Sequence, residues 1–132
     1  MPRTSAAHRA LLRAQRGGYS RDMGDFLQVS TATETRDQAV ELAASAVRER
    51  LAAGAQVVGP VTSVFWHLGK FGTGEEWRLL LTTRAERYQA LEDHLLRHHP
   101  WDNPEVSAVP VVAGSEASFR WIETNTTPEA AS

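Results

Sequence analysis

The residue types most able to do chemistry gather in the stretch HLLRHHPW, residues 94–101, which holds three of the chain's five histidines. His94 and His98 are four positions apart, so on a helix they share a face and could both reach one ion. His98 and His99 are adjacent and could share an ion only if the helix ends between them. Pro100 favours such an end, because the residue before a proline avoids helical geometry. The spacing therefore admits a metal site at the end of a helix.

Two carboxylates, Asp102 and Glu105, follow this stretch. Imidazole with carboxylate suits copper(II) or zinc, whereas the lack of thiolate and the scarcity of thioether argue against copper(I). A second interpretation needs no ion, because histidine near a helix C-terminus interacts favourably with the helix dipole. Both interpretations stay open, and in neither is a metal required for folding.

Composition removes several classes of function. The 132 residues contain no cysteine, which excludes a disulfide framework, a thiol nucleophile and a cysteine zinc site. A net charge of -2 argues against a nucleic-acid or acidic-membrane partner. No apolar run approaches the roughly 20 residues that span a bilayer, and no signal peptide is evident, so we expect a cytoplasmic protein. Phosphate-loop, nucleophile-elbow and His-Glu-x-x-His motifs are missing from the sequence, so we do not expect an enzyme.

Hydrophobic periodicity predicts the elements that must position these groups. Alternating patterns predict strands at residues 25–32, 55–66, 76–82 and 106–112, with the glycine-rich stretch 67–76 as a hairpin connection. Gly59-Pro60 interrupts the second strand, where we expect a bend or bulge, because proline cannot donate to a ladder. Apolar steps of three and four predict helices at residues 35–53 and 83–98, and Ser115 is placed to cap a short last helix.

Capping signals mark the helix ends. Thr35 with Gln38, and Thr83 with Glu86, each form a capping box, and Gly54 is placed to end the first helix in a left-handed conformation. The resulting order is βαββαβ with a short C-terminal helix. Two such split units interleave into a four-stranded antiparallel sheet with both helices on one face, which is the α+β ferredoxin-like fold.

This fold covers only one face of its sheet, so the other face must meet water, a ligand or another chain. Aromatic residues flank the central hairpin, at Phe65, Trp66, Phe71 and Trp77, and Trp101 lies on a loop nearby. Exposed aromatics beside long strands mark an interface. We therefore expect the chain to associate with copies of itself.

A cleft that binds an anion is a further hypothesis. Trp66 and Lys70, the only lysine, could line it together with Trp101. Arg84 lies in the first turn of the predicted second helix, and helix N-termini favour anions. The alternative for Trp66 and Lys70 is that they serve only the architecture of the hairpin. The alternative for Arg84 is that it lies in a solvated first turn of the helix.

The two ends of the chain differ in composition from the middle. Residues 1–24 carry five arginines among alanine, serine and glycine, which predicts a disordered basic tail. Residues 126–132 have the composition of a second tail. Residues 25–125 then form one domain.

Five stretches, in this order and spacing, resemble the CutA divalent-cation-tolerance family across about residues 26–125. They are VSTATETRDQAVELAASAVRERLAAG, VTSVFWHLGK, EEWRLLLTTRAERYQALEDHL, HHPWDNPEVSAVPV and FRWIE. The resemblance implies a ferredoxin-like homotrimer built by edge-strand pairing, similar to PII signalling proteins, with clefts between subunits. It also implies a link to tolerance of copper and other divalent metals, and it brings no catalytic reaction.

The resemblance places His98, His99 and Glu105 where the metal-linked residues of the family lie. Ser30 stands where metal-binding members can carry a cysteine. The first functional hypothesis is therefore weak binding of copper or another divalent metal at a histidine-rich site between subunits. The second is a PII-like trimeric sensor or scaffold that binds a small anion or a partner protein in its clefts, and the serine at position 30 makes it more attractive.

Overall fold

The computed structural model describes residues 24–128 of the 132-residue chain. Residues 1–23 and 129–132, and with them most of both expected tails, lie outside the described residues. The elements, in chain order, are β1 (Phe26–Thr33), α2 (Arg36–Arg48), β2 (Gly54–His67), β3 (Lys70–Arg84), the 3-10 helix η2 (Ala85–Arg87), α3 (Tyr88–His98), β4 (Ser107–Pro110) and α4 (Glu116–Asn125). None of the helices in this range is long and apolar enough to cross a membrane.

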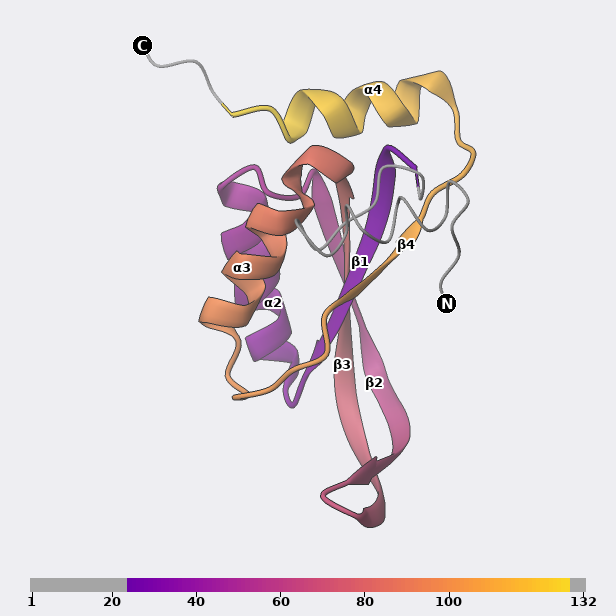
Figure 1. The fold of residues 1–132 in the computed structure, drawn as a ribbon. Coiled ribbons are helices and arrows are strands. Elements are labelled where there is room, and N and C mark those ends of the chain that lie inside the picture. Colours follow the sequence, from indigo (N-terminus) through magenta and orange to yellow (C-terminus); the bar gives the residue numbers. More distant parts are fainter. Residues whose placement is uncertain (1–23, 129–132) are drawn as a thin grey trace, which may run out of the picture.

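The four strands form one antiparallel sheet in the order β2-β3-β1-β4. Helices α2 and α3 lie side by side on one face of it, and α4 lies across one end (Figure 1). The expected α+β ferredoxin-like fold with a short C-terminal helix is confirmed. Its core lies between the sheet and the two long helices.

Alternating side chains of the central strands supply the sheet side of this core, as the two-residue period of a strand requires. The buried cluster combines Leu27 and Val29 of β1, Leu79 and Leu81 of β3, Leu42 and Ala46 of α2, and Leu91 and Leu95 of α3. Thr31 of β1 points into the same layer, and its hydroxyl is buried with no hydrogen-bond partner.

The first helix begins as predicted and ends earlier than predicted. Thr35 Oγ1 accepts the Gln38 N–H at 3.1 Å, and Gln38 Oε1 accepts the Thr35 N–H at 3.2 Å, which completes the capping box. Helix α2 stops at Arg48 because Arg50, not Gly54, takes the left-handed conformation, with φ of 59°. The Leu51 N–H then bonds to the Ala46 carbonyl and Leu51 packs into the core. The predicted glycine end at Gly54 is wrong, since Gly54 opens β2.

The second capping box is also wrong. Thr83 belongs to β3, and its buried hydroxyl donates to the Leu51 carbonyl at 2.7 Å instead of capping a helix. A 3-10 turn, η2, connects β3 to α3, and no side chain caps either of their N-termini. The burial of Thr83 and its bond to a residue distant in the sequence therefore outweigh the local capping pattern.

The hairpin between β2 and β3 is longer than predicted. Its turn consists of Leu68 and Gly69, both with positive φ, and Lys70 already belongs to β3. The predicted bulge at Gly59-Pro60 is confirmed as a register shift between Val58 and Val61. Beyond it the two strands continue past the rest of the sheet as a two-stranded arm, residues 61–76, which extends away from both helices (Figure 1).

The C-terminal elements close the other end of the sheet. Ser115 caps α4 as expected, with its Oγ accepting the Ser118 N–H at 3.1 Å. Strand β4 is shorter than the predicted 106–112 and ends at Pro110, whose nitrogen has no hydrogen to donate. Thr126, the first residue of the expected C-terminal tail, is fully buried, and its N–H bonds to the Ile122 carbonyl.

Candidate functional site

His99 connects the end of α3 to the end of β1 through a hydrogen bond. The residue is only 8% exposed, and Nε2 lies 2.8 Å from the Ala32 carbonyl oxygen, which can only accept. The Nδ1 atom, 3.0 Å from the Trp101 backbone nitrogen, accepts that N–H. The ring is therefore the neutral tautomer with its hydrogen on Nε2, and both nitrogens are committed.

Burial lowers the pKa of His99 below its ordinary value, because the charged imidazolium is disfavoured away from water; the hydrogen bond to Ala32 opposes this shift. The neutral form thus fits the hydrogen-bond pattern. A metal ion would have to displace Trp101 or Ala32 to reach a lone pair on this ring.

His94 is also buried, at 1% exposure, and it joins α3 to α2. Its Nε2 lies 2.8 Å from Ser45 Oγ, and the Ser45 hydroxyl donates to the Leu42 carbonyl at 2.8 Å. Because the single hydroxyl hydrogen is used there, His94 Nε2–H is the donor to Ser45. Burial lowers the pKa of His94, and the neighbouring His98 lowers it further, while Glu49 opposes the shift.

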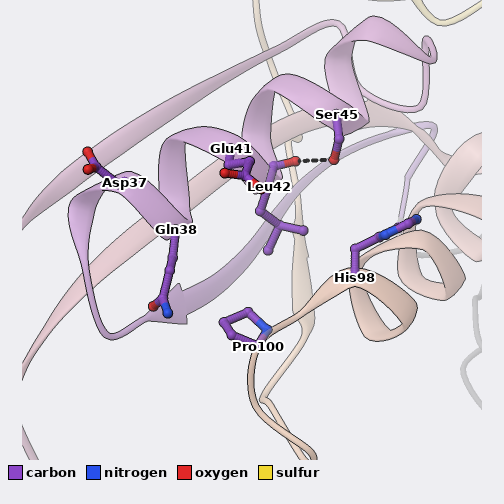
Figure 2. Close-up of a pocket in the computed structure, with 7 residues that line it drawn as sticks. All are labelled: Asp37, Gln38, Glu41, Leu42, Ser45, His98 and Pro100. Carbon is purple, nitrogen blue, oxygen red and sulfur yellow. Dashed lines mark hydrogen bonds between the residues drawn. The ribbon is translucent and has the colours of Figure 1, made fainter.

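His98 is the exposed member of the group. Its ring contacts that of His94, with centroids 4.4 Å apart. It lines a cavity of about 280 Å³ between α2 and the end of α3, together with Asp37, Gln38, Glu41, Leu42, Ser45 and Pro100. Figure 2 shows the α2 side chains on one side of this cavity and His98 and Pro100 on the other.

The other expected metal ligands lie apart from this cavity. Glu105 is exposed and accepts a long hydrogen bond of 3.4 Å from Ser107. Ser30 lies on the helix-free face of the sheet, because its neighbours Val29 and Thr31 point into the core. Between residues 24 and 128, no three His, Cys, Asp or Glu side chains stand close enough to hold one ion. A complete ligand set is therefore not assembled within one copy of the described chain.

Sequence reasoning missed the polar partners of the histidines. Asp37 and Glu41 line the same cavity as His98, and Ser45 bonds to His94. Asp37, Glu41 and Ser45 recur at steps of four along α2, which was a usable signal that they share a helix face. That this face meets α3 was not visible in the spacing.

The expected anion cleft is not brought together in one copy. Arg84 lies at the opposite end of β3 from Lys70. Its guanidinium donates to Thr126 Oγ1 at 2.8 Å and to the Thr126 carbonyl at 3.1 Å, and Glu86 lies 3.8 Å away. Trp101 is half-buried beside the His99 ring, 5.2 Å between centroids. The guanidinium of Arg84 therefore binds the chain that follows α4, and it does not form an open anion site.

Exposed apolar side chains gather on the arm instead. Val64 is 62% exposed, Trp66 74%, Leu68 88% and Phe71 63%. Trp66 and Phe71 pair across the two strands in an edge-to-face contact with centroids 5.7 Å apart. Contiguous exposed apolar groups of this kind mark an interaction surface.

The site and the fold together define a class: a ferredoxin-like α+β protein with a histidine-bearing helix end and a protruding apolar hairpin. The family model described as CutA1 divalent ion tolerance protein matches residues 27–125. The chain belongs to this family, which confirms the resemblance noted in the sequence.

Curated relatives have the same family name. The chain is 36% identical over 85 residues to Protein CutA 1, chloroplastic, of Oryza sativa, an alignment that covers 64% of this chain and 48% of the rice protein. It is 34% identical over 91 residues to Protein CutA, chloroplastic, of Arabidopsis thaliana, covering 69% and 50%. The chain thus spans about half the length of these plant relatives. The divalent-cation tolerance protein CutA of Salmonella newport is 36% identical over 84 residues, covering 64% and 73%.

Solved structures agree with the fold. CutA from Xylella fastidiosa superposes with a TM-score of 0.76 at 29% identity, covering 79% of this chain and all of that one (100%). CutA1 from Oryza sativa superposes with a TM-score of 0.75 at 31% identity, covering 78% and 94%. None of these names states a reaction.

Proposed function

We propose that this protein serves divalent-cation tolerance as a homotrimer, and that it binds copper or another divalent metal weakly near His98. The exposed apolar arm is the observation that supports the proposed self-association. Val64, Trp66 and Phe71 are more than half exposed, and they lie beyond the reach of α2 and α3. Covering them with another copy would remove this apolar surface from water, which favours association.

Sedimentation tests the assembly. We expect the wild-type chain to sediment as a trimer of 14.6 kDa subunits, and a Trp66→Ala/Phe71→Ala variant to shift toward the single chain. Leu96→Ala is a matched control, because Leu96 is an exposed apolar residue on α3, away from the arm. A wild-type particle of 14.6 kDa that stays stable at micromolar concentration would contradict the proposal.

His98 supports the metal part of the proposal because its side chain is exposed, with its ring in contact with that of His94. Glu105 and Ser30 are also open to solvent in part, so a neighbouring copy is able to bring them near His98. His99 contributes only if its bonds to Ala32 and Trp101 break. Two or three such ligands completed by water give a weak and labile site, in contrast to the closed four-ligand sites of structural metals.

Calorimetric titration with copper(II) and with zinc separates these ligands. We expect His98→Ala to abolish the binding heat, and Glu105→Gln to weaken it. His67→Ala is the control, since His67 is an exposed histidine on the arm. Isotherms that are identical for the wild type and His98→Ala would remove the site.

A second candidate, a sensor whose clefts bind a small anion, has one observation in its favour. Lys70 is exposed at the tip of the arm next to the aromatic pair of Trp66 and Phe71. In an assembly that buries the arm, this amine would lie near another copy. A thermal-shift series with nucleotides and organic acids tests it: stabilisation of the wild type that is lost in Lys70→Gln supports it, and no stabilisation by any compound counts against it.

A further inference from the structure

Strand β2 pairs with β3 from Gly54 to His67 except at one point. Val58 pairs with Arg78 and Val61 pairs with Glu76, so β2 advances three residues where β3 advances two. One extra residue on one strand is a β-bulge, which bends the strand and increases its twist. Trp77 is the β3 residue opposite this bulge.

The bulge lies where the arm leaves the sheet. Trp77 is also the residue nearest the arm at which β3 still pairs with β1, opposite Thr33. From Glu76 and Val61 onward only β2 and β3 continue (Figure 1). The bend therefore stands at the junction of the packed sheet with the arm, and not at a random point of the hairpin.

A glycine is required at this junction. A Cβ atom on Gly59 would lie 2.8 and 2.9 Å from ring atoms of Trp77, and 3.2 Å from the Glu76 carbonyl oxygen. The Trp77 ring thus lies directly on the backbone of Gly59. This contact fixes the bend from the β3 side, because straightening the strand would separate the two.

We infer that the bulge at Gly59-Pro60 determines the specificity of self-association by aiming the arm, an inference that rests on the assembly proposed above. The arm extends about 20 Å beyond the bulge at about 3.3 Å per residue. A change of about 20° in the bend would move Trp66 and Phe71 sideways by about 7 Å, further than one strand spacing. A surface on a second copy that fits the arm at one angle would no longer meet it.

Two variants change the bulge. Deletion of Gly59 removes the extra residue yet leaves Val58 opposite Arg78 and Val61 opposite Glu76, so the same side chains still face one another. Gly59→Ala keeps the length but forces Trp77 away. Gly74→Ala is the matched control within the arm, because its Cβ would meet only Phe65, at an ordinary contact distance of 3.8 Å. Circular dichroism and thermal unfolding report the fold, and sedimentation reports the native mass.

We expect the wild type and Gly74→Ala to share one oligomeric mass. The deletion and Gly59→Ala should keep the native far-ultraviolet spectrum but lose that mass, falling to the single chain or to a different assembly. Unchanged mass in both variants overturns the inference, and so does failure of both to fold, since the bulge would then serve the fold and not the assembly. A wild type that is itself monomeric refutes the proposed self-association instead.

Discussion

The imidazole of His99 connects the end of α3 to the end of β1, because its Nε2–H donates to the Ala32 carbonyl oxygen across 2.8 Å. The same ring accepts the Trp101 N–H, so it also fixes the start of the loop that leads to β4. In this arrangement His99 holds three segments of the chain together, whereas His98 beside it faces solvent.

Replacing His99 by alanine should therefore destabilise the protein strongly. The substitution leaves a buried carbonyl oxygen and a backbone N–H without partners and opens a cavity, for which we expect a loss of about 2–4 kcal/mol in the free energy of unfolding. His98→Ala is the control, with an expected change of less than about 0.5 kcal/mol, because the residue is exposed. Urea unfolding of both variants measures the difference; equal stabilities would contradict a clamping role for His99.

The helix end at these histidines was predictable, but the partners of their rings were not. Pro100 indicated that the helix stops at His98, and α3 does end there, with His99 extended at φ of -68° and ψ of 140°. Ala32, however, is 67 positions away in the sequence, and Ser45 is 49 positions from His94. Local spacing says which groups share a helix face, and it does not say which distant carbonyl or hydroxyl they meet.

The two buried histidines should make stability depend on pH in a defined window. The pKa of each is lowered in the fold, chiefly by burial. The unfolded chain, with a histidine pKa of about 6.5, therefore binds protons first as the pH falls. Stability is complete above about pH 6.5 and decreases below it, with a slope of at most about 1.4 kcal/mol per pH unit for each group.

Urea unfolding from about pH 8 to pH 5 measures this slope. A His94→Gln/His99→Gln variant should show a shallower fall below pH 6.5 than the wild type, although it starts from a lower stability. Leu96→Ala, which alters an exposed side chain of α3 that does not titrate, should leave the slope unchanged. A double variant with the wild-type slope would assign the acid sensitivity to other groups.

The buried hydroxyl of Thr31 has no hydrogen-bond partner, so removing it should increase the free energy of unfolding. Thr31→Val keeps the shape of the side chain and removes a buried polar atom that has no hydrogen bond, so we expect a gain of about 1 kcal/mol. Thr83→Val makes the same exchange on the neighbouring strand β3, where the buried hydroxyl donates to the Leu51 carbonyl at 2.7 Å. That variant should lose about 1–2 kcal/mol. Thermal or urea unfolding compares them, and a loss in Thr31→Val would mean that its hydroxyl has a partner in solution.

The two threonines that began a capping pattern show why one of the two patterns failed in this chain. Thr35 and Thr83 are each followed three residues later by Gln or Glu, and only Thr35 caps a helix. Thr35 is exposed and free to turn toward its own helix, whereas Thr83 is fully buried and bonded to Leu51. The order of strands and helices along the chain and the apolar stripes of the helices were predictable because they depend on periodicity. Whether a threonine caps a helix inside the core depends instead on which distant residues pack against it.

The contact of Arg84 with Thr126 predicts how α4 is held. Two bonds, to Thr126 Oγ1 and to its carbonyl, tie the end of α4 to the end of β3, while the Phe26–Phe119 ring stack, 4.3 Å between centroids, holds the start of the helix. Arg84→Met should therefore loosen only the last turn. We expect hydrogen exchange to accelerate about 5- to 30-fold, as a loss of 1–2 kcal/mol implies, at residues 122–127 and to stay unchanged near Phe119. Arg36→Met, at an exposed position of α2, is the control; uniform acceleration along α4, or none, would show that the guanidinium does not hold this end.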